Sequence, residues 1–185
     1  MNDLAELVRT IRALDPGAYG PQNIGQLLAD VDFGVEAVKP YMTFRKGLYT
    51  RNLVFQNDDV EVAILCWDAA SATPVHDHAS QRCWMTSLQG SFDVENYERA
   101  VGGVREGYAR LRLTSTFEGM QRGQPDYRYL ENDIHRVRVS PDAAGAVSLH
   151  VYAKPIASCL VFDPQREYCT VQQLRWDSVA PYSRS

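Results

Sequence analysis

Hydrophobic and polar positions divide the chain into a short helical front and a long β-rich body. Near the start, apolar residues recur at the spacing of one helix face: Leu4, Leu7, Val8, Ile11 and Leu14. Asp15-Pro16-Gly17 ends that segment. A second helix is predicted over residues 25–38, because its apolar positions share one face and Pro40 follows its end. The front of the chain therefore predicts two short helices.

From Tyr49 onward the pattern changes to short runs rich in β-branched and aromatic residues, separated by Gly, Pro, Asn and Asp. The predicted strands are Tyr49–Phe55, Val60–Trp67, Arg82–Leu88, Phe92–Tyr97, Arg110–Leu113, Ile134–Val139, Val147–Tyr152 and Cys159–Phe162. Short strands at regular intervals are typical of an antiparallel barrel or jelly roll. We predict one mostly β domain over residues 1–185. Its parts are a helical front (1–45) packed on a barrel (46–165) and a C-terminal extension (166–185) without an assigned role.

Composition narrows the function classes. The chain has 185 residues, enough for one domain with a substantial core, and 19 Lys+Arg against 23 Asp+Glu give a net charge of −4. Without a basic run, nucleic acid and anionic membranes are not expected partners. No apolar stretch approaches the roughly 18 residues that span a bilayer, and because the first residues are acidic and lack an apolar run, we do not expect them to be a signal peptide. We expect a soluble, cytoplasmic protein whose four cysteines are free thiols. A monomer is expected, and an oligomer is the alternative.

All four histidines are candidates for one polar interior. Residues at positions i and i+2 of a strand point to the same side, so His76 and His78 can hold one metal ion from one direction. His135 supplies a third imidazole, and three neutral nitrogens leave open coordination positions for substrate. His150 lies in Ser148-Leu149-His150-Val151-Tyr152, whose three polar residues again share one strand face. Buried, hydrogen-bonded strand histidines are the alternative interpretation.

The spacing around the histidine pair resembles the first motif of the cupins, which runs His-x-His, a short gap, an acidic ligand and a glycine. Here His76-Asp77-His78 is followed by Cys83, where most cupins have Glu, and Gly90 takes the place of the glycine. A thiol therefore replaces the carboxylate ligand. The resemblance implies a cupin-type antiparallel β-barrel.

Further motifs, in the same order along the chain, resemble the cysteine dioxygenases of type I, cupin enzymes that oxidise a thiol to a sulfinate with ferrous iron. These motifs are Tyr49-Thr50-Arg51-Asn52-Leu53-Val54, Cys66-Trp67, His76-Asp77-His78 with Cys83, Leu88-Gln89-Gly90, His135-Arg136-Val137, Ser148-Leu149-His150-Val151-Tyr152, and Cys159 before Phe162-Asp163. Together they cover most of the barrel.

The resemblance implies that His76, His78 and His135 bind Fe(II) and that Arg51 receives the substrate carboxylate, with Tyr49 on the same strand face. A guanidinium pairs with a carboxylate through charge-assisted hydrogen bonds. A surface arginine on the outer face of the strand is the alternative. Relatives that prefer 3-mercaptopropionate carry Gln at the position of Arg51, so the arginine favours cysteine.

The resemblance also implies an active-site tyrosine, Tyr152, supported by Ser148 and His150. In the animal enzymes this tyrosine is joined by a thioether bond to a cysteine that matches Cys83, so a Cys83–Tyr152 cross-link is expected here. A buried Cys beside a buried Tyr without a bond is the alternative. The sequence departs from the animal enzymes at Tyr152-Ala153-Lys154-Pro155, where they have Ser-Pro-Pro after the tyrosine.

The expected function is therefore oxidation of L-cysteine by O2 to cysteine sulfinate in cysteine catabolism. Two alternatives remain. One is a dioxygenase of another small thiol, such as 3-mercaptopropionate, mercaptosuccinate or cysteamine. The other is a non-redox cupin that binds zinc, manganese or no metal.

Overall fold

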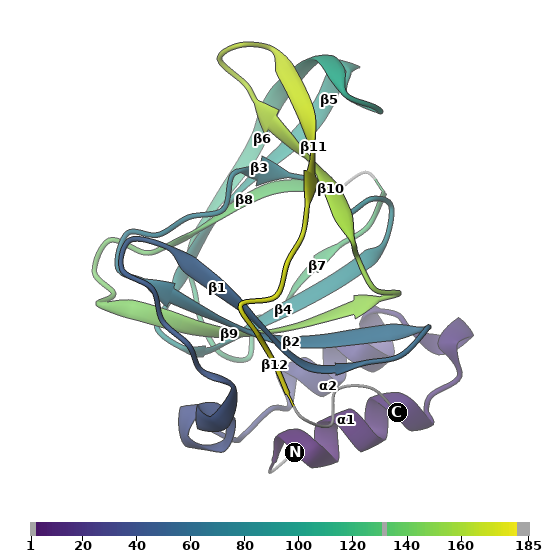
Figure 1. Cartoon of the computed structure of the whole chain (residues 1–185), viewed down its shortest axis with the longest axis vertical. Helices are drawn as coiled ribbons and strands as arrows, with labels where there is room; N and C mark the ends of the chain where they lie inside the picture. The colour runs from purple at the N-terminus through teal and green to yellow at the C-terminus, as the bar shows by residue number, and fades with distance from the viewer. Residues whose placement is uncertain (1–2, 131–132, 181–185) are drawn as a thin grey trace.

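The computed structural model describes residues 3–130 and 133–180 and contains two β-sheets that face each other, with helices on the outside of one of them (Figure 1). The α-helices are α1 (Leu4–Ala13) and α2 (Gln26–Ala29). The strands are β1 (Tyr49–Gln56), β2 (Val60–Asp68), β3 (Val75–His76), β4 (Arg82–Gln89), β5 (Phe92–Gly102), β6 (Gly107–Met120), β7 (Asp126–Arg128), β8 (Ile134–Val139), β9 (Gly145–Ala153), β10 (Ser158–Asp163), β11 (Tyr168–Gln173) and β12 (Ser178–Val179).

The first sheet has the strand order β12-β1-β2-β9-β4-β7, and the helical front lies under its outer face in Figure 1. One apolar cluster joins the two layers. From the helical front it includes Leu4, Leu7, Ile11, Ile24, Leu28 and Val38, and from the sheet Val54, Val62, Ile64, Trp84, Leu149 and Val151. Because helices cover one face and the second sheet covers the other, β2 and β9 are buried along almost their whole length. This explains why apolar residues occur on both faces of these two strands.

The second sheet is a closed ring of pairings in the order β10-β11-β6-β5-β8-β3. Between the sheets, large side chains such as Trp67, Met85 and Phe92 fill one end of the interior. The polar candidate residues lie beside them, around a cavity that Trp67 also lines. Gly90 turns the chain between β4 and β5 at φ 74°, and a Cβ there would lie 2.6 Å from the carbonyl oxygen of Gly145. Glycine is therefore required at the turn that follows β4. The fold is the expected mostly β, cupin-type antiparallel barrel with short helices packed on it.

The single helix predicted over residues 25–38 is wrong. The chain forms a π-helical turn at Pro21–Gly25, the short helix α2, and a separate 3₁₀ helix at Val35–Tyr41. Between the last two, Asp30 to Gly34 contains residues with low helix propensity, which do not continue α2. The apolar periodicity is real, because Ile24, Leu28 and Val38 are buried, but three short elements present it instead of one.

The β structure also extends further than predicted. Strands β5 and β6 form a long hairpin, at the upper end of the molecule in Figure 1, where the sequence predicted two shorter strands. The barrel boundary expected at residue 165 is too early, because β11 pairs with both β10 and β6. The extension beyond it also contributes β12, which pairs with β1 in parallel. No helix among the described residues is long and apolar enough to cross a membrane.

Candidate metal centre and substrate cavity

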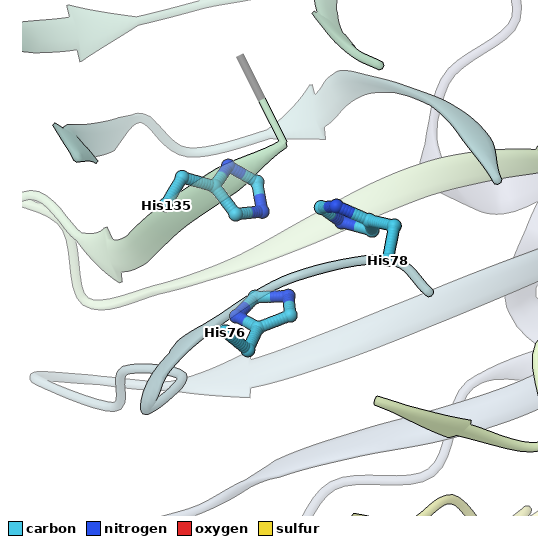
Figure 2. Close-up of side chains that lie close together, drawn as sticks. All are labelled: His76, His78 and His135. Carbon is cyan, nitrogen blue, oxygen red and sulfur yellow. The ribbon is translucent and has the colours of Figure 1, made fainter. Parts of the chain in front are cut away.

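Three imidazole rings converge in the interior between the two sheets (Figure 2). His76, His78 and His135 each offer a ring nitrogen, and these three atoms lie within 4.8 Å of one another. The ring centroids are 5.0 Å apart for His76 and His78, 4.8 Å for His76 and His135, and 4.9 Å for His78 and His135. Such a near-equilateral arrangement presents one face of three nitrogens to a single point.

The backbone brings the three rings together in two ways. His76 and His135 are directly paired across β3 and β8. The expectation that His76 and His78 share one strand is wrong, because β3 ends at His76. Side-chain hydrogen bonds fix the loop instead: Asp77 Oδ1 accepts from the Leu160 backbone N–H at 2.8 Å, and the His78 N–H donates to Asp133 Oδ1 at 3.0 Å. Carboxylate anchors thus replace strand pairing at His78.

Hydrogen bonds at Nδ1 leave Nε2 available for a metal. Nδ1 of His76 lies 3.0 Å from the Pro74 carbonyl oxygen, and Nδ1 of His78 lies 3.0 Å from that of Asp133. A carbonyl oxygen only accepts, so in a neutral ring Nδ1 carries the proton and Nε2 keeps a lone pair. This is the usual support of metal-binding histidines, in which the second nitrogen donates to a protein acceptor.

The third histidine has a weaker support. Nδ1 of His135 lies 3.5 Å from Asp126 Oδ2, within range of a charge interaction but without a well-formed hydrogen bond. Asp126 is held in turn by Arg128, whose Nε lies 2.6 Å from Asp126 Oδ2. Burial raises the pKa of Asp126, but its interactions with His135 and Arg128 lower the pKa by more than burial raises it. The carboxylate is therefore ionised. An ionised Asp126 can orient His135 when the ring shifts slightly toward it.

Two of the three histidines are held in the neutral state that binds a metal, and the third carries a proton. Burial lowers the pKa of His76 to about 3, and burial together with Arg128 lowers the pKa of His135 well below its ordinary value. Burial also lowers the pKa of His78, but Cys83 and Asp133 raise it more, to about 10. A metal would therefore compete with one proton, at His78. The donor set of three imidazoles fits a divalent transition metal and leaves coordination positions open.

The three histidines line a cavity of about 600 Å³, a volume that includes the opening to solvent. Every residue that the sequence singled out for the site lines the same cavity, apart from Ser148: Tyr49, Arg51, His76, His78, Cys83, His135, His150 and Tyr152. Ser148 is fully buried and contacts His150 Nε2 at 2.9 Å. The structure thus brings together residues from β1, β3, β4, β8 and β9.

Arg51 points into this cavity and has a hydrogen-bond donor to spare. Its Nη2 lies 3.2 Å from Glu61 Oε1, and its guanidinium stacks over the Trp176 ring with Cζ 4.3 Å from the centroid. The second terminal nitrogen, Nη1, is buried without a partner among the described residues. A buried, unpaired donor of a charged group is costly, so this atom is suited to receive an anion.

A directed chain of hydrogen bonds ends at Tyr152. The Trp67 indole N–H, which can only donate, gives its hydrogen to Ser148 Oγ at 2.8 Å. The hydroxyl of Ser148 has no acceptor among the described residues other than His150 Nε2 at 2.9 Å, so it donates there. Burial and Arg51 lower the pKa of His150 to about 3, which keeps the ring neutral with its proton on Nδ1.

His150 Nδ1 lies 3.3 Å from the Tyr152 hydroxyl oxygen and donates to it. The hydroxyl hydrogen of Tyr152 is then free to point into the cavity. Burial, followed by the nearby Cys83, raises the pKa of Tyr152 well above its ordinary value, so Tyr152 stays protonated and acts as a donor. Cys83 is the direct cross-strand neighbour of Tyr152 in the β4–β9 pairing, and both side chains are buried.

Sequence reasoning missed several residues that support the site: Glu61, Asp126, Arg128, Gln172, Leu174 and Trp176. Only Glu61 carried a usable signal, as a carboxylate inside the apolar strand Val60–Trp67. Trp176 and Leu174 lie in the extension to which no role was assigned. Conversely, Lys154 is exposed, at φ 77°, and does not line this cavity.

Comparisons with known proteins identify the family of the chain. Residues 3–165 match the family model "Cysteine dioxygenase type I". The chain is 26% identical over 188 residues to "Cysteine dioxygenase type 1" of Danio rerio, covering 98% of this chain and 92% of that protein. It is 28% identical over 162 residues to the Rattus norvegicus protein of the same name, covering 86% and 78%.

Among solved structures, an RmlC-like cupin protein from Desulfovibrio desulfuricans is similar, with 18% identity, a TM-score of 0.44, and coverage of 62% of this chain and 91% of that one. The family match spans most of the described chain and includes every site residue that the sequence predicted. The chain belongs to the cysteine dioxygenase type I family.

Proposed function

We propose that this protein is an iron-dependent thiol dioxygenase that converts L-cysteine and O2 into cysteine sulfinate. Both oxygen atoms are transferred to sulfur, and the S–H hydrogen remains as the acid proton of the product. The observation that carries the proposal is that a face of three histidines and an arginine with an unpaired donor share one buried cavity. A thiol that also carries a carboxylate fits both ends of such a site.

His76, His78 and His135 would hold ferrous iron, which when bound supplies open positions for the thiol and dioxygen and the redox chemistry between them. The protein's own contribution is first to fix the substrate. Arg51 holds the carboxylate through Nη1, and because Trp176 and Glu61 fix the guanidinium, the thiol sulfur has one preferred position. Fixed orientation of two reactants lowers the barrier by removing their freedom in advance.

Tyr152 supplies a hydrogen bond to the oxygen atoms that receive charge during the reaction. Its hydroxyl accepts from His150, so its own hydrogen is directed into the cavity. The donor is already oriented by the chain from Trp67 through Ser148, and it needs no rearrangement when charge develops.

A cross-link between Cys83 and Tyr152 is part of this proposal, because the two residues are cross-strand neighbours with buried side chains on one sheet face. The Cys83 S–H and one C–H of the Tyr152 ring would each lose hydrogen, an S–C bond would form, and O2 would accept two electrons and two protons. Intact-protein mass spectrometry after aerobic turnover should show the loss of two hydrogens, whereas Cys83→Ser should keep its mass. An unchanged mass in protein that has turned over would contradict the cross-link.

A panel of thiols tests the function. Oxygen uptake and sulfinate formation are measured with cysteine, 3-mercaptopropionate, mercaptosuccinate and cysteamine, using protein loaded with iron or with zinc. We expect iron-dependent turnover that is fastest with cysteine. Equal rates with cysteamine would contradict the role of Arg51, and no oxygen uptake with any thiol would contradict dioxygenase activity and favour a non-redox cupin.

A further inference from the structure

A buried carboxylate stands directly behind the substrate arginine. Glu61 is 1% exposed and Arg51 is 7% exposed, and a single contact of 3.2 Å joins Oε1 to Nη2. Glu61 does not line the cavity, whereas Arg51 does. The carboxylate therefore neutralises the guanidinium from the side opposite to the substrate.

The pairing of strands fixes this position. Glu61 lies opposite Tyr152 in the β2–β9 pairing, on the interior face of the sheet. Its contact with Arg51 uses one donor of the guanidinium and leaves Nη1 for a second anion. When a substrate carboxylate binds there, two carboxylates share one guanidinium in a buried space. Two like charges so close to each other favour protonation of one of them.

We propose that Glu61 is a positioning residue that takes up a proton when a carboxylate binds to Arg51, so that the buried site keeps the same net charge with and without substrate. The inference rests on the proposed function, because it requires a substrate with a carboxylate. The substrate carboxylate stays ionised, the proton comes from solvent, and protonated Glu61 still accepts from Nη2 through its carbonyl oxygen.

The surroundings of Glu61 support proton uptake by this group. From the elements packed against β2, Arg51 of β1 and Tyr152 of β9 act on its carboxylate, and the backbone N–H of Ile156 donates to it. Burial raises the pKa of Glu61 to about 7, although Arg51 and the Ile156 N–H lower it. Partial withdrawal of the Arg51 charge by a substrate carboxylate raises the pKa further.

The test compares cysteine with cysteamine, two thiols that differ by the carboxylate. Iron-loaded protein is titrated without oxygen at about pH 8, where a group of pKa about 7 is roughly nine-tenths ionised. Calorimetry in buffers of different ionisation enthalpy gives the number of protons exchanged on binding. The protein, Glu61→Gln and the matched control Glu118→Gln, which removes an exposed carboxylate from β6, are measured side by side.

On binding cysteine, the unmodified protein and Glu118→Gln should each take up almost one proton more than Glu61→Gln. On binding cysteamine, all three proteins should exchange the same number of protons. Infrared difference spectra of the unmodified protein provide a second measurement that needs no variant: cysteine should produce a new protonated-carboxyl band, and cysteamine should not. Equal proton counts, or no such band, with normal cysteine binding would overturn the inference alone. Failure of every thiol to bind would overturn the inference and the proposed function together.

Discussion

Replacing Arg51 by glutamine removes the guanidinium but keeps a neutral donor toward Glu61. The substitution deletes the one buried nitrogen that has no partner, Nη1, and with it the charge that attracts the substrate carboxylate. Glu61 does not become a buried charge, because without Arg51 its pKa rises above about 7 and it is mostly protonated at pH 7. The decrease in activity of Arg51→Gln therefore measures the contact between Arg51 and the substrate.

The expected size follows from that single contact. A hydrogen bond to a charged group contributes about 1.5–3 kcal/mol, which corresponds to roughly a 10- to 150-fold decrease in kcat/KM for cysteine. Cysteamine has no carboxylate, so its kcat/KM should change by less than about threefold, within the range of a surface substitution. The ratio of the two values, rather than either one alone, measures the role of Arg51.

Oxygen consumption with each thiol, at matched iron content, provides the assay. Arg110→Gln is the matched control, because it removes an exposed arginine from β6 and should leave both values unchanged. If Arg51→Gln oxidised cysteine as efficiently as the parent, or lost cysteine and cysteamine activity equally, the assignment of Arg51 to the carboxylate would be wrong.

Three other predictions concern the cavity and the carboxylate behind it. His78→Ala should contain less bound iron in elemental analysis. His150→Ala should keep its iron and lose activity, because both ring nitrogens of His150 bond to protein hydroxyls. Equal iron content in the two variants would contradict the three-histidine site. Tyr152→Phe should lower kcat about 10- to 100-fold with little change in KM, since one oriented donor is lost; a change in KM alone would refute this role.

The third prediction concerns how the stability of the folded protein depends on pH. The pKa of Glu61 in the folded protein, about 7, lies above the ordinary value of 4.5 for a glutamate, so the folded state holds more protons between these two values. Stability therefore falls as pH rises through that window, by up to about 3 kcal/mol. Urea unfolding at about pH 5 and about pH 8 should show that Glu61→Gln lacks this part of the dependence; identical dependence in both proteins would contradict it.

The sequence was sufficient for the barrel and for the residues that share its interior. Alternation along Val147–Tyr152 predicted that Ser148, His150 and Tyr152 share one face, and the structure joins them by hydrogen bonds. β2 is buried on both faces, and its run of apolar residues from Val62 to Trp67 made that strand recognisable as well. The family resemblance was necessary for Arg51, since a lone arginine in a strand does not indicate which face it occupies.

Other features could not be predicted because they depend on tertiary contacts. Asp126 and Arg128 lie two residues apart on β7, and Asp126 comes close to His135 only through the tertiary fold, in which β7 pairs with β4. Trp176 follows β11 in the chain, and no local pattern indicates that it stacks on Arg51. The prediction of one helix over residues 25–38 was wrong for a related reason. Its apolar residues are buried as expected, but Asp30 to Gly34 interrupt the helix between them.

Labelled oxygen tests the central claim most directly. Iron-loaded protein is supplied with cysteine and ¹⁸O₂, and the product is examined by mass spectrometry beside protein carrying His76→Ala. The account predicts cysteine sulfinate with both oxygen atoms labelled, formed only when the three histidines are intact. Sulfinate with one labelled oxygen or none, or full activity without His76, would contradict it.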